Sequence, residues 1–165
     1  MGTSANHHGV ISGLRILALE IRAGQFAFVY LERASKLIDC GVRRCRAEPK
    51  RGASTAADAM ARAFDRCQPT LVIIRRSEEN AISAAARREA RARSVPVRSV
   101  SWAAVRKFFR AQGCRNKQAR ATVIAEWYPE LQRKLPAERK VQHGEPYHML
   151  IFDAAAAAVA YFASR

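Results

Sequence analysis

The chain has 165 residues, with 29 Lys or Arg against 14 Asp or Glu, and a formal net charge of +15. This length fits a single domain with a real core, and an apolar fraction of 49% excludes general disorder. No apolar stretch reaches the roughly 18 residues that span a bilayer. The charge therefore favours a polyanionic partner, nucleic acid before an anionic membrane surface.

The start of the chain and the cysteines suggest where the protein works. The first residues lack the basic-then-apolar pattern of a signal peptide, so we expect a flexible segment at 1–14 before one domain at 15–163. The sequence contains four cysteines, Cys40, Cys45, Cys67 and Cys114. Without Cys-x-x-Cys spacing, a zinc site or a disulfide framework is disfavoured. Reduced thiols and a cytoplasmic location are the prediction.

The run from Arg15 to Ile21 is apolar apart from Glu20, and it predicts a strand buried on both faces. A tight turn and a second strand over Phe26–Leu31 follow. A carboxylate at the end of a buried strand costs free energy unless it is paired, metal-bound or in water. Glu20 is therefore either a candidate site residue or a solvated glutamate at the end of a strand.

The next elements predict a meander followed by a crossover. Leu37–Arg43 is read as a third strand, and Thr55 caps a helix that Pro69 ends. Thr70–Ile74 is the strongest strand signal, with apolar and β-branched residues throughout. A strand, a helix and a strand in this order indicate a crossover and a parallel pairing.

The second half predicts mainly helices. We expect a helix over Ser77–Arg93 capped by Ser77, an edge strand over Val95–Val100 containing Pro96, and a helix capped by Ser101. Helices over Lys117–Trp127 and 147–163 complete the chain. The basic residues at strand ends, on outward helix faces and in loops are candidate phosphate contacts, or simply a solvated surface: Arg75, Arg106, Lys107, Arg110, Arg115 and Lys117.

Asp153 is the one acid inside the apolar last helix, next to the polyalanine run Ala154–Ala158. Aspartate is a poor helix former and is expensive to bury without a partner. It is either an exposed residue on the outer face of the helix or a second candidate site residue.

The order of elements resembles the ribonuclease H-like α/β fold, a mixed five-stranded sheet with helices on both faces. Within that fold the chain resembles RuvC-like Holliday junction resolvases from about Arg15 to Phe162. The resemblance is carried by four segments: Ile16–Glu20, Pro69–Ile74, Gly113–Gln118 and Phe152–Ala155.

The resemblance implies a metal-dependent site for phosphodiester hydrolysis. Glu20 and Asp153 would meet above the sheet and hold Mg²⁺ or Mn²⁺, with Glu145 as a further ligand. Lys117 would stabilise the charge that develops on the phosphate. The implied substrate is branched DNA, and the implied assembly is a homodimer.

Two positions depart from the family pattern. Arg75 stands where the second-strand acid is expected, and Leu150 replaces a ligand three residues before Asp153. The nearby residues that might substitute are Glu78, Glu79, Glu145 and His148. Arg75 has the charge to occupy the place of the metal and neutralise Glu20 and Asp153. Three functions stay open: a junction endonuclease, an inactive relative that only binds nucleic acid, and a basic assembly or ribosome-associated scaffold.

Overall fold

The computed structural model describes residues 13–46, 55–76, 78–137 and 147–165. Most of the segment predicted to be flexible, 1–14, lies outside these ranges, and so do Ser77 and Glu145. The remaining elements belong to one five-stranded sheet with helices on both faces, as the sequence predicted.

The sheet combines a meander with two parallel strands. Its strands are β1 Arg15–Arg22, β2 Gln25–Glu32, β3 Lys36–Arg44, β4 Leu71–Arg75 and β5 Val97–Val100. They lie in the order β3-β2-β1-β4-β5, with β1, β2 and β3 antiparallel and with β4 parallel to both β1 and β5. The predicted edge strand over Val95–Val100 is confirmed as an edge, although β5 begins at Val97, after Pro96.

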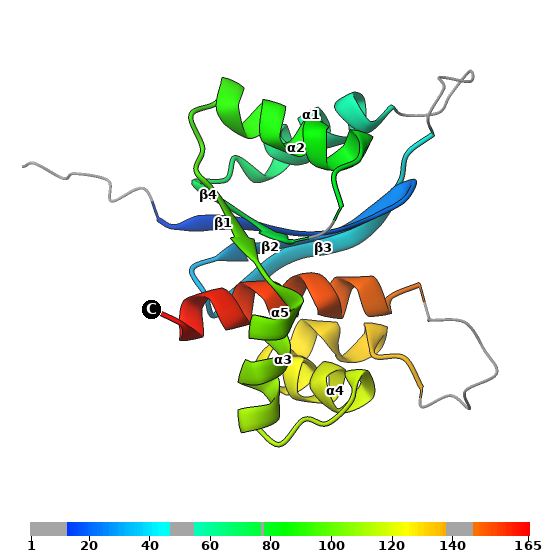
Figure 1. The fold of residues 1–165 in the computed structure, drawn as a ribbon, viewed down its shortest axis with the longest axis vertical. Helices are drawn as coiled ribbons and strands as arrows, with labels where there is room; N and C mark the ends of the chain where they lie inside the picture. The colour runs from blue at the N-terminus through cyan, green and yellow to red at the C-terminus, as the bar shows by residue number, and fades with distance from the viewer. Residues whose placement is uncertain (1–12, 47–54, 77, 138–146) are drawn as a thin grey trace, which may run out of the picture.

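Helices cover the sheet in two layers (Figure 1). Helices α1 Ala56–Cys67 and α2 Ala81–Ala92 pack on one face, around Phe26, Met60 and Phe64. On the other face lies α5 Met149–Ala163, with α3 Trp102–Ala111 and α4 Lys117–Trp127 beneath it; the short 3₁₀ helix η1 Pro129–Lys134 follows α4. Each face of the sheet therefore has its own apolar core.

Helix α5 crosses the sheet closely because its side chains are small. Ala154–Ala158 are fully buried, and α5 contacts all five strands. Leu150, one turn earlier, is buried in the same core and offers no ligand atom. The close approach fixes Asp153, which belongs to the same segment, against the sheet.

Two of the three predicted helix caps are confirmed, and the third is corrected. Thr55 and Ser101 accept hydrogen bonds from the backbone N–H groups of Asp58 and Ala104. Helix α2, however, begins after Asn80 rather than Ser77, because the Asn80 side chain accepts from two backbone N–H groups. Ser83 completes a reciprocal capping box by accepting from the Asn80 N–H.

The cysteines are free thiols within the described residues, and we expect them to be unreactive in the folded protein. Burial raises the pKa of all four thiols, and that of Cys67 to about 11. The thiolate is the reactive form, so 5,5′-dithiobis(2-nitrobenzoate) at pH 8 should react slowly with the native protein and fully after unfolding. Rapid reaction of the native protein would contradict this.

Candidate functional site

Glu20 is buried at the end of β1, in a fork made by Arg75. Parallel pairing sets Leu19 opposite Ile74, so the next residues of the two strands, Glu20 and Arg75, are neighbours. Arg75 Nε lies 2.6 Å from Glu20 Oε2, and Arg75 Nη2 lies 2.7 Å from Oε1. The Glu20 side chain is 0% exposed. A bidentate pair of this kind is among the strongest side-chain hydrogen-bond arrangements.

Asp153 is equally buried, at 1% exposure, and is held by two cations from α4. Lys117 Nζ lies 3.1 Å from Asp153 Oδ2, and Arg120 Nη2 lies 3.1 Å from Oδ1. Lys117 and Arg120 are three positions apart, so both reach α5 from the same side of α4. The Asp153 side chain is thus neither exposed nor unpartnered.

Arg22, two residues after Glu20 in β1, connects the two acids. Its Nε lies 3.0 Å from Glu20 Oε1, and its Nη2 lies 3.5 Å from Asp153 Oδ2. Since one guanidinium touches both carboxylates, acids from opposite ends of the chain meet over the same face of the sheet. The sequence predicted that convergence, although it did not predict Arg22.

The residues around Glu20 and Asp153 do not fit a divalent metal ion. Both oxygens of each carboxylate lie against an Arg or Lys nitrogen, and four cations, Arg22, Arg75, Lys117 and Arg120, surround two negative charges. The cluster is therefore net positive and repels a cation. A Mg²⁺ site needs carboxylate oxygens facing the ion.

Among the residues that the structure describes, no further acid compensates for this excess of positive charge. In the described part of the chain, no group of three or more His, Cys, Asp or Glu is placed to hold a metal. Glu79 pairs with Arg87 on the surface instead. Glu78 and His148 are exposed.

Trp102, at the start of α3, forms a second layer on these cations. The Arg120 guanidinium carbon lies 4.5 Å from the indole centroid, the Arg75 guanidinium carbon 5.4 Å, and Lys117 Nζ 5.9 Å. Contacts of cations with an aromatic face are attractive. Trp102 is half-buried and contacts three of the site's cations.

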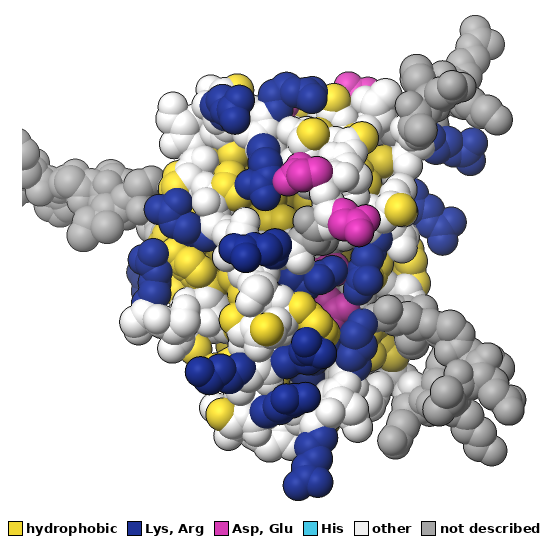
Figure 2. All heavy atoms as spheres, viewed as in Figure 1, with side chains coloured by type: hydrophobic (Ala, Val, Ile, Leu, Met, Phe, Trp, Pro, Cys, Tyr) yellow, Lys and Arg dark blue, Asp and Glu magenta, His cyan; other side chains and the backbone are white. Residues whose placement is uncertain are grey.

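Beside this cluster lies a hollow of about 220 Å³ with a basic lining. Four of the predicted nucleic-acid contacts line it: Arg106, Arg110, Arg115 and Lys117. Lys107 lies beside it, lining a neighbouring depression with Arg106 and Arg110. Arg75 is set apart, against Glu20 and Trp102. Figure 2 shows Lys and Arg side chains gathered over the part of the surface formed by α3 and α4.

Sequence reasoning missed Arg22 and Arg120, although a spacing rule indicates both. Alternate residues of a strand share a face, which places Arg22 on the side of Glu20. Residues three apart on a helix also share a face, which places Arg120 with Lys117. The missing information was that Asp153 would be buried between them.

Neither a protein family model nor a curated protein sequence matches this chain. Solved structures do. Thermus thermophilus RuvC in complex with a Holliday junction substrate aligns with a TM-score of 0.62 at 13% identity, covering 90% of this chain and 92% of that one. Another Thermus thermophilus RuvC structure aligns with a TM-score of 0.63 at 15% identity, covering 90% and 93%. The chain has the RuvC fold.

A eukaryotic resolvase shares this RuvC fold. The yeast mitochondrial Holliday junction resolvase Ydc2 aligns with a TM-score of 0.50 at 13% identity, over 90% of this chain and 79% of that one. The sequence-based resemblance to RuvC-like resolvases is therefore confirmed at the level of the fold. Within the described ranges, no helix is long and apolar enough to cross a membrane.

Proposed function

We propose that this RuvC-fold protein binds branched nucleic acid without hydrolysing it, and that arginine and lysine side chains stand where metal ions would be held. The observation that carries the proposal is the fork between Arg75 and the fully buried Glu20, at 2.6 and 2.7 Å. At Glu20 and Asp153, every carboxylate oxygen that could bind the implied Mg²⁺ or Mn²⁺ already lies against an Arg or Lys nitrogen.

The cations that replace the metal are poorly suited to activate water. An arginine stays protonated in proteins and has no acceptor atom, so Arg22, Arg75 and Arg120 cannot act as general bases. The carboxylates that might do so are buried and ion-paired. The same cations remain able to attract phosphate, because Arg22 and Lys117 are more than one-third exposed.

The binding surface combines this cluster with the basic hollow on α3 and α4. Arg106, Arg110 and Arg115 are exposed there, and none of the described residues that line the hollow is acidic. Contacts to phosphate position a protein on nucleic acid without reading its sequence. The similar Thermus thermophilus RuvC structure holds a Holliday junction substrate, so a four-way DNA junction is the first ligand to test. A homodimer and a cytoplasmic location stay predictions.

The test measures the affinity for a fluorescent four-way junction in EDTA and in Mg²⁺ or Mn²⁺. Equal affinity and no cleavage are expected, with a loss of about 10³–10⁵ in affinity between 50 and 200 mM salt if roughly 6–10 phosphates are contacted. The pair Arg106→Gln and Arg110→Gln should reduce the salt slope by about 2. The matched pair on α2, Arg88→Gln and Arg91→Gln, should leave it unchanged.

Two results would overturn the proposal. Affinity that does not depend on salt would reject the nucleic-acid interface. Metal-dependent cleavage that disappears in Glu20→Gln and Asp153→Asn would show that the site is an active nuclease, as the resemblance first implied.

A further inference from the structure

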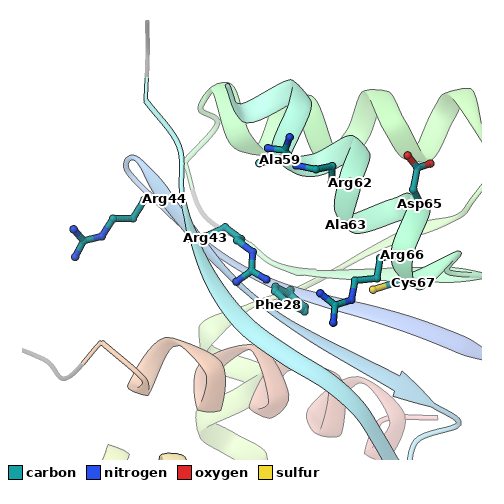
Figure 3. Close-up of a pocket in the computed structure, with 9 residues that line it drawn as sticks. All are labelled: Phe28, Arg43, Arg44, Ala59, Arg62, Ala63, Asp65, Arg66 and Cys67. Atoms are coloured by element: carbon teal, nitrogen blue, oxygen red, sulfur yellow. The ribbon is translucent and has the colours of Figure 1, made fainter. Parts of the chain in front are cut away.

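A groove of about 510 Å³ lies between α1 and β3, on the opposite face of the sheet from Glu20 and Asp153. Its volume lies in the range of small-ligand sites, roughly 300–1,000 Å³. The base of the groove is apolar, with Phe28, Ala59 and Ala63, and its walls are basic. Figure 3 shows arginines from both α1 and β3 around Phe28.

The groove exists because β3 is an edge strand and contains a glycine at the right place. Gly41 pairs with Phe28 across the strands. A Cβ on Gly41 would lie 3.0 Å from Phe28 Cε1 and 3.1 Å from Arg43 Nη1. Glycine thus lets the ring and the guanidinium lie against the strand, with Arg43 Cζ 5.1 Å from the ring centroid. The result is an exposed arginine that lies over an aromatic ring.

The charge of the groove is strongly positive. Arg43, Arg62 and Arg66 line it, and all three are exposed. Arg66 pairs with Asp39 at 3.0 Å, yet its side chain remains 65% exposed. Asp65, the one acid among the described lining residues, is neutralised by Arg93 at 2.7 Å.

Arg44 also lines the groove but points away from Phe28 (Figure 3). Its guanidinium carbon lies 5.6 Å from the Tyr147 ring centroid. The basic wall that faces the groove therefore consists of Arg43, Arg62 and Arg66.

We propose that this groove binds an unpaired nucleotide of single-stranded nucleic acid. Its base would stack on the outer face of the Arg43 guanidinium, and its phosphate would lie between Arg62 and Arg66. Stacking and a basic groove are the usual means of binding single strands. A duplex presents its phosphates outward and its bases stacked inside, so it would leave the apolar base of the groove unused. The inference rests on the proposed nucleic-acid binding and adds a second site for a different form of nucleic acid.

Binding of a fluorescent ten-residue oligothymidylate tests the inference beside the four-way junction. Arg43→Gln with Arg66→Gln removes two cations, which should weaken oligothymidylate binding about tenfold or more and reduce its salt slope by about 1.4. Ala63→Leu keeps every charge and fills the groove, and it should also weaken binding. Arg88→Gln with Arg91→Gln is the charge-matched control on α2. Thermal unfolding checks that each variant folds.

The outcomes separate this site from the proposed function. Groove variants that lose oligothymidylate and retain the junction support the inference, as does photo-crosslinking of 5-iodouracil oligomers to β3 or α1. If the native chain binds the junction but not oligothymidylate, the inference is overturned and the proposed function stands. The same holds if the groove variants bind oligothymidylate as tightly as the native chain. No binding of either ligand overturns both. Binding of thymidine monophosphate as tight as that of the oligomer would show a free-nucleotide site rather than one for a strand.

Discussion

Replacing Arg75 by Met should lower the free energy of unfolding by about 3–5 kcal/mol, because removing one partner leaves a buried charge uncompensated. Glu20 is 0% exposed and loses both hydrogen bonds of the fork. Only Arg22 then remains against it, at 3.0 Å. Urea denaturation measures the change.

The neighbouring residue provides the control, since Arg76→Met changes an exposed side chain and should alter stability by about 0.5 kcal/mol or less. A double variant, Arg75→Met with Glu20→Leu, removes both charges and should recover most of the loss. If Arg75→Met were as stable as the native chain, the fork would not hold the site together. If the double variant lost more unfolding free energy than Arg75→Met and Glu20→Leu lose together, the two side chains would not stabilise the fold as a pair.

Replacing Asp153 by Ala should also lower the free energy of unfolding by about 3–5 kcal/mol. Arg120, with its side chain 7% exposed, then lies buried beside Lys117 without the carboxylate that neutralises both. That carboxylate joins α4 to α5 in addition to the apolar contacts between the two helices. Fluorescence of Trp102, which lies over Arg120 at 4.5 Å, should change as the cations move.

Asp65→Ala is the matched control for this substitution. Asp65 also pairs with an arginine, Arg93, but its side chain is 70% exposed, so the loss should be about 1 kcal/mol or less. Equal effects at Asp153 and Asp65 would contradict the importance we assign to burial of the ion pairs.

Much of the fold follows from local sequence signals. The apolar residues of β1, β2 and β4 follow one another closely in the sequence, and these strands lie where the pattern predicts them. Caps at Thr55 and Ser101 fix two helix starts through one side-chain hydrogen bond each. At α2, several capping residues stand close together, and the reciprocal hydrogen bonds of Asn80 and Ser83 decide the start. The capping preference of each residue type does not by itself decide which of these residues caps the helix.

The site was predictable in part, for a physical reason. A lone acid at the end of a buried strand and another inside an apolar helix are costly, and that cost drew attention to Glu20 and Asp153. Arg75 was visible because it replaced an expected acid. Arg22 and Arg120 look like ordinary surface residues in the sequence. Only the packing of α5 against β1, and of α4 against α5, shows that both reach the carboxylates.

A titration of the native chain with Mn²⁺, followed by electron paramagnetic resonance of the free ion, tests most directly whether cations have replaced the metal. We expect no saturable binding at millimolar Mn²⁺, and the same titration curve for Glu20→Gln, because Arg75 and Arg22 already occupy the Glu20 oxygens. One or more Mn²⁺ ions bound per chain, and lost in Glu20→Gln, would contradict the account.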